Sequence, residues 1–85
     1  MSTNPDPLGR ADDQIVTLLS HWLTRRLGND ELRRKVEEIG TDELAPGQRD
    51  AVRELLAELA AAPPGERGQL EVTVRETVET LVYGD

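Results

Sequence analysis

The sequence predicts an all-α fold, a small four-helix bundle-like domain. Helix-forming residues (Ala, Leu, Glu and Arg) dominate the composition, apolar residues recur at helical spacing, and glycines or prolines separate these periodic stretches. We expect helices at about 12–27, 30–39, 46–62 and 69–83. Residues 11–85 then form a single helical domain. Residues 1–10, with two prolines and a glycine and little that is apolar, are expected to form a disordered N-terminal tail.

The first helix carries an apolar arc wider than one neighbouring helix needs. Asp12 or Asp13 is expected to cap its start, Arg25 and Arg26 to lie in its last turn, and Gly28 to follow its end. About half of the helix circumference is apolar, through Ile15, Val16, Leu18, Leu19, Trp22, Leu23 and Leu27. We therefore expect this helix to contact two others, or one other helix and a second chain.

The second helix has a narrower apolar stripe and a highly charged surface. Asn29 is expected to be its N-cap and Gly40 to end it. Three oppositely charged pairs are four residues apart: Glu31–Lys35, Arg33–Glu37 and Arg34–Glu38. Such pairs are each worth a few tenths of a kcal/mol on a helix surface. The basic residues here therefore indicate a solvated helix face rather than an anion-binding patch.

The third stretch is the strongest helix former and is expected to be the hub on which the other three helices pack. Val52, Leu55, Leu56 and Leu59 follow helical spacing. Pro46 suits the first helical position, and the Gln48 side chain can fold back as in a capping box. The prolines after Ala62 end the helix, and Leu44 is expected to reach the core from the preceding connector.

The last stretch fits either a strand or a helix. Leu70, Val72 and Val74 alternate as in a strand. Helical spacing instead places one apolar face along Leu70, Val74, Val78, Leu81 and Val82. Fifteen residues are long for a strand, so we favour a helix. Val72 and Tyr83 would then project away from its core face.

Charge and composition limit the partners. The net charge of −7 argues against nucleic acid and against anionic membranes, and it suits a basic protein partner. No apolar run is long enough for a membrane span and no signal peptide is evident, so a cytoplasmic protein is expected. Many arginines against one lysine, with abundant alanine, indicate a GC-rich bacterial genome.

We find no pattern of residues that predicts catalysis, a metal site or a cofactor. One histidine and no cysteine exclude the usual zinc ligand sets. His21 has Thr17 and Arg25 as its helical neighbours, so the helix supplies neither a nucleophile nor an orienting carboxylate. The glycines form no phosphate-binding loop. We therefore expect no enzyme activity and no small-molecule substrate.

In size, acidity and predicted helix number the chain resembles acyl and peptidyl carrier proteins. That family attaches its prosthetic arm to a serine in an Asp-Ser-Leu type motif at the start of a helix. The serines here are Ser2, in the tail, and Ser20, inside the first helix. The motif is missing, so the family's function is not assigned to this chain.

The candidate functional residues are Trp22, Arg26 and Tyr83, which we expect to bind a partner. Trp22 is the one large aromatic anchor of the first helix, and it suits either the core or an interface hot spot. Arg26 follows one turn later on the same apolar face, where it can extend into solvent or stack on the indole. These residues predict a non-catalytic interaction module, an adaptor or regulatory subunit that binds a protein or a second copy of itself. The alternative is an acidic mimic that occupies a basic, nucleic-acid-binding protein surface.

Overall fold

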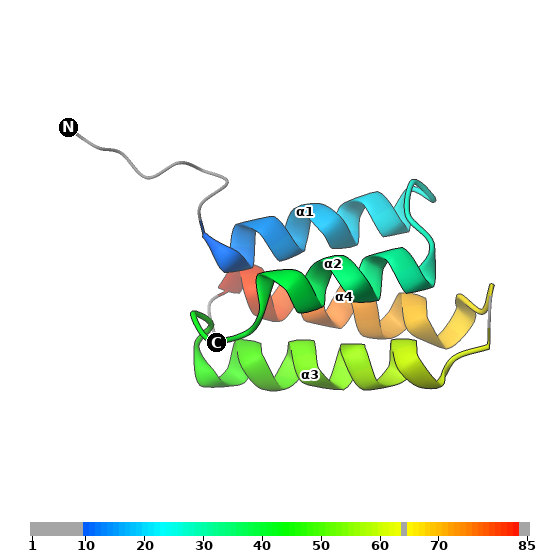
Figure 1. The fold of residues 1–85 in the computed structure, drawn as a ribbon. Helices are drawn as coiled ribbons and strands as arrows, with labels where there is room; N and C mark the ends of the chain where they lie inside the picture. Colours follow the sequence, from blue (N-terminus) through cyan, green and yellow to red (C-terminus); the bar gives the residue numbers. More distant parts are fainter. Residues whose placement is uncertain (1–9, 64, 84–85) are drawn as a thin grey trace.

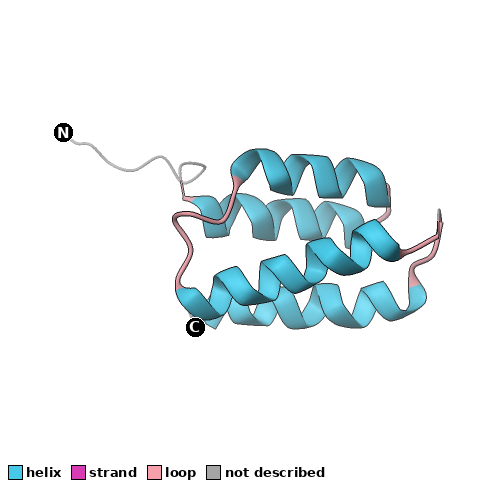
Figure 2. Cartoon of the chain, turned by 60° about the horizontal axis from the view of Figure 1, so that its bottom comes forward, coloured by secondary structure: helices cyan, strands magenta, loops and turns pink. Residues whose placement is uncertain are grey.

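The computed structural model describes residues 10–63 and 65–83, and this part of the chain is helical with no strand. The helices are α1 (Ala11–Leu23), α2 (Asn29–Ile39), α3 (Pro46–Ala61) and α4 (Gly68–Tyr83), joined by short loops (Figures 1 and 2). The all-α prediction is confirmed, and the last segment is a helix rather than a strand. The tail predicted for residues 1–10 lies outside the described residues, apart from Arg10.

The four helices form an antiparallel bundle in which each helix runs opposite to the next one along the chain (Figure 1). The principal neighbours are α1 with α2, α2 with α3, α3 with α4, and α4 with α1. The prediction that α3 is a hub for three helices is therefore wrong. In this four-helix bundle, α1 lies diagonally opposite α3, and the core side chains between them keep the two helices apart. Of the two alternatives predicted for α1, the structure shows contact with two other helices, α2 and α4.

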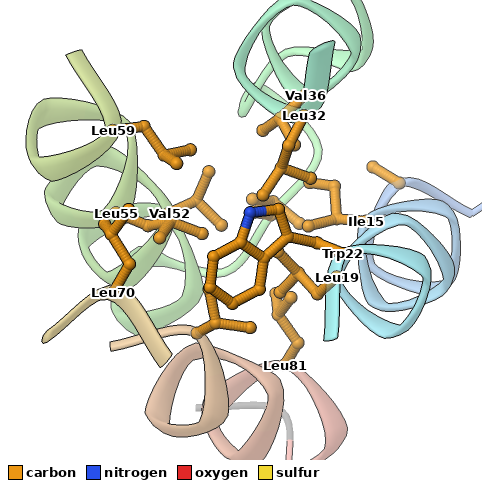
Figure 3. Packing of buried hydrophobic residues seen from close by; sticks show 13 residues of the cluster. Ile15, Leu19, Trp22, Leu32, Val36, Val52, Leu55, Leu59, Leu70 and Leu81 are labelled. Atoms are coloured by element: carbon orange, nitrogen blue, oxygen red, sulfur yellow. The ribbon is translucent and has the colours of Figure 1, made fainter. Parts of the chain in front are cut away.

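The core lies along the bundle axis and receives side chains from every helix. Figure 3 shows the Trp22 indole, which belongs to α1, between the four helices. The fully or almost fully buried apolar residues are Ala11, Ile15, Leu19, Trp22, Leu32, Val36, Leu44, Val52, Leu55, Leu59, Leu70, Val74 and Leu81. Leu44, from the α2–α3 connector, is among them as predicted. The chain has no Phe, and Trp22 is the largest fully buried side chain of the core.

Helix α1 ends at Leu23, four residues before the predicted end. Arg25 takes a left-handed conformation with φ 66°. Its N–H donates to the Trp22 carbonyl at 3.0 Å, and the Arg26 N–H donates to the His21 carbonyl at 2.8 Å. These two bonds form a Schellman motif, in which the left-handed position is usually glycine. The prediction that Gly28 ends this helix was wrong because an arginine occupies the glycine position.

The helix starts also differ from the predicted caps. The residue before α1 is Arg10, and Asp12 and Asp13 lie in the first turn, where their charges still suit the helix dipole. The residue before α2 is Gly28, so Asn29 is the first helical residue. The side chain of Asn29 does not cap the helix because it is bound to groups from two other segments, described below.

The start of α3 is tied to the end of α4. Gln48 folds back as predicted, and its Oε1 accepts a hydrogen bond from the Ala45 N–H at 3.0 Å. Its Nε2 donates to the Leu81 carbonyl of α4 at 3.1 Å. This side chain is buried, and both of its polar atoms are satisfied. The nearby Arg49 guanidinium donates to the carbonyls of Thr41 and Leu44 and closes the α2–α3 connector.

Two threonines, rather than Val82, complete the buried face of α4. Thr73 and Thr77 are buried, whereas Val82 is 63% exposed. The Thr77 hydroxyl donates to the Thr73 carbonyl at 2.8 Å, and the Thr73 hydroxyl donates to Glu58 Oε1 of α3 at 2.7 Å. These bonds let two polar side chains occupy core positions. The sequence prediction counted apolar residues only, and so it placed Val82 on the wrong side.

Candidate interaction surface

A cluster of polar contacts surrounds Trp22 at the end of the bundle where the α1–α2 and α3–α4 loops meet (Figure 1). The indole is fully buried, and its Nε1–H donates to Asn29 Oδ1 at 2.7 Å. Asn29 Nδ2 in turn donates to the Glu66 carbonyl at 2.9 Å. A buried indole N–H needs an acceptor, and Asn29 supplies it while joining the two loops.

Arg67 completes this cluster from the α3–α4 loop. Its guanidinium lies over the Trp22 ring, 4.2 Å from the ring centroid. Nη1 donates to the Trp22 carbonyl at 2.7 Å, and Nη2 donates to the Leu27 carbonyl at 2.8 Å. The planar fork of an arginine suits this double contact combined with stacking. We call the four residues Trp22, Asn29, Glu66 and Arg67 the Trp22 cluster.

The structure separates the three residues predicted to bind a partner. Trp22 has 0% exposure, so in this conformation a partner cannot touch its indole. Arg26 is exposed in the turn after α1, and the guanidinium stacked on the indole belongs to Arg67. Tyr83 is 78% exposed at the last residue of α4, near the opposite end of the bundle (Figure 1). Arg26 and Tyr83 therefore do not share one surface patch.

Sequence reasoning missed Asn29, Glu66 and Arg67 as partners of the tryptophan. Arg67 is 45 residues from Trp22 in the chain, and helical periodicity carries no information over that distance. One signal was present, because a core tryptophan needs an acceptor for its N–H and a side-chain amide follows seven residues later.

Large hydrophobic side chains are exposed on one helix. In the described part of the chain they are Val72 at 48%, Val82 at 63% and Tyr83 at 78%, and all belong to α4. The prediction that Val72 and Tyr83 project away from the core is confirmed. The surplus apolar residues of α1 are instead packed against the core and partly buried, namely Val16, Leu18 and Leu23. Leu27, in the loop after α1, is packed in the same way. The unpartnered apolar surface therefore lies on α4 rather than α1.

The outward face of α4 has a regular pattern. Val72, Arg75, Glu79 and Val82 are spaced by three, four and three residues, so they fall within an arc of about 80°. This arc is centred roughly 160° from the buried Leu70, Thr77 and Leu81. All four residues of the arc are exposed. We call them the α4 stripe.

The rest of the described surface shows no group of residues suited to metal binding. Among the described residues, no three of His, Asp and Glu lie close enough together to hold a metal ion. One open surface hollow of about 440 Å³ has Leu81 and Val82 on its wall. Within the same residues, no buried side-chain N or O atom lacks a hydrogen-bond partner, and no helix has the length and apolarity needed to cross a membrane.

Of the predicted charged pairs on α2, Arg33 and Glu37 form a contact at 3.4 Å. This pair lies on the surface, where such contacts contribute little stability.

The fold and these contacts define a small all-α bundle with an apolar and charged stripe on its last helix. The chain matches no protein-family model, and comparison with curated proteins and with solved structures found no match.

Proposed function

We propose that this protein is a small, acidic, non-catalytic interaction module, an adaptor or regulatory subunit that binds a protein partner or a second copy of itself through the outward face of α4. One observation carries the proposal: the exposed large hydrophobic side chains of the described chain, Val72, Val82 and Tyr83, all belong to this helix. Exposed apolar residues that are confined to one helix favour a protein contact, whereas those scattered singly over a surface are ordinary.

The charges around these residues indicate a mixed apolar and polar contact. Arg75, Glu76 and Glu79 lie on exposed positions between Val72 and Val82. A partner would need apolar side chains at the two ends of this face and complementary charges between them. Such charges fix register and orientation more than they add affinity.

The test is affinity capture with the tagged full chain and two variants. Val72→Ser/Val82→Ser removes exposed apolar atoms from α4, and Arg53→Ser/Glu54→Ser is the matched control at exposed positions of α3. Circular dichroism first confirms that all three proteins have the same helix content and melting temperature. We expect the wild type and the control to retain a protein partner, or untagged copies of the chain, and the α4 variant to lose it.

Salt separates this proposal from the acidic-mimic alternative. An apolar contact survives high ionic strength, whereas binding of acidic residues to a basic surface weakens steeply. Equal recovery by the α4 variant and the wild type would overturn the proposal. Loss of the partner at high salt together with retention by the α4 variant would favour the acidic mimic.

A further inference from the structure

The α4 stripe is complementary to itself under a two-fold rotation. Val72 and Val82 lie equally far from position 77, and so do Arg75 and Glu79. An antiparallel helix pair with its two-fold axis at the level of Thr77 therefore sets Val72 against Val82 of the second copy. The same rotation sets Arg75 against Glu79 of the second copy. Both contacts occur twice, as an isologous interface requires.

We infer that the occupant of the α4 stripe is a second copy of this chain, bound antiparallel through α4. This inference rests on the proposed function, because it names the partner of the same surface. The spacing of the stripe is that of the a and d positions of a heptad, and antiparallel helix pairs bring a residues of one helix against d residues of the other. The paired region spans about 15 Å, which is about ten residues of helix rise.

The charges select this arrangement over its competitors. In a parallel pair Arg75 would face Arg75 of the second copy, and Glu79 would face Glu79. A shift of one residue in the register of the antiparallel pair would set Val72 against Tyr83 of the second copy. It would also set Glu76 against Glu79 of the second copy. Like charges that face one another oppose association, so both alternatives are less favourable than the arrangement centred at Thr77.

Residues beside the stripe add one favourable and one unfavourable contact. On one side of the two-fold axis, the half-buried Val78 of one chain approaches Val78 of the second copy, which is favourable. On the other side, the exposed Glu76 approaches Glu76 of the second copy, which is unfavourable. A single helix pair this short is smaller than a standard interface, so we expect a dissociation constant in the micromolar range or weaker. Glu76→Gln should tighten the dimer because it removes the like-charge contact.

The experiment uses complementary charge reversals and sedimentation equilibrium from micromolar to millimolar protein. Arg75→Glu makes both pairs Glu against Glu, and Glu79→Arg makes both pairs Arg against Arg. Each variant alone should have a dimer dissociation constant raised at least about tenfold. A one-to-one mixture of the two should form a heterodimer, because every pair is then Arg against Glu. The double variant Arg75→Glu/Glu79→Arg should dimerise like the wild type.

Controls separate the interface from helix stability and from net charge. Arg53→Glu and Glu54→Arg on α3 make the same changes in charge at exposed positions and should leave the dimer unaltered. Arg75 and Glu79 are also four residues apart within one helix, so melting curves of dilute samples measure that separate effect.

Two outcomes would overturn the inference. One is a wild type that stays monomeric up to millimolar concentration, and the other is a mixture of Arg75→Glu and Glu79→Arg that does not associate more strongly than each alone. If either occurs while affinity capture still shows a partner lost with Val72→Ser/Val82→Ser, the surface is an interface for a different protein. The proposed function then stands and this inference fails.

Discussion

Removal of the Arg67 side chain should destabilise the protein more than removal of any other exposed or half-buried arginine. Arg67 donates to the Trp22 and Leu27 carbonyls at 2.7 and 2.8 Å and lies 4.2 Å from the indole centroid. Hydrogen bonds from charged donors are worth about 1.5–3 kcal/mol each, and a cation–π contact about 0.5–2 kcal/mol. The guanidinium is half-buried, so solvent screening lowers these values.

We therefore expect Arg67→Ala to lower the free energy of unfolding by about 2–4 kcal/mol. For a domain of this size, each kcal/mol corresponds to about 4–8 °C, so the melting temperature should fall by roughly 10–25 °C. Arg67→Lys keeps the charge, but an ammonium cannot reproduce the planar double contact. We expect it to recover less than half of the loss.

Thermal and urea unfolding provide the assay, followed by circular dichroism and by the fluorescence of Trp22, the single tryptophan of the chain. The matched control is Arg26→Ala in the exposed turn after α1, which should change stability by less than about 0.5 kcal/mol. A loss for Arg67→Ala no larger than that of the control would refute the reasoning. So would full stability in Arg67→Lys.

Two further variants test the helix ends. Gln48→Ala should lower the free energy of unfolding in urea by about 1–3 kcal/mol, because the buried bonds to Ala45 and Leu81 are lost. The control is Gln69→Ala at an exposed position of α4, which should be near neutral. Arg25→Gly should raise the melting temperature by about 2–4 °C, because glycine adopts the left-handed conformation without the steric cost that arginine has there. This gain in stability exceeds the loss that comes from the greater backbone entropy of glycine in the unfolded chain. An unchanged or lower melting temperature would mean that the arginine side chain stabilises this turn.

Periodicity predicted the helices well because each one buries a single face. The buried Ile15, Leu19 and Trp22 of α1 repeat at intervals of four and three residues, as do the core residues of α3. This pattern depends on residues within a few turns of one another, which the sequence displays directly. For the same reason the exposure of Val72 and Tyr83 could be predicted.

Helix ends and the candidate site depended on contacts that the sequence does not display. The end of α1 depends on an arginine in a conformation that favours glycine, and Asn29 serves the indole instead of the helix start. The sequence left open whether Trp22 lies in the core or at an interface. Its burial depends in part on Arg67, a loop residue that covers the ring. The exposure of Tyr83 could be predicted because it follows from the residue's own helix, and its part in binding stays a prediction.

The two ends of α4 are held in ways that bear on its use as a contact surface. At its start, the adjoining Arg67 is bonded to the carbonyls of Trp22 and Leu27. At its end, the Leu81 carbonyl accepts a bond from Gln48 of α3. A helix fixed at both ends presents its outward side chains without first having to become ordered, and this lowers the entropy cost of binding. Gln48→Ala should therefore weaken association through the α4 stripe, measured by sedimentation equilibrium, although Gln48 does not belong to the stripe.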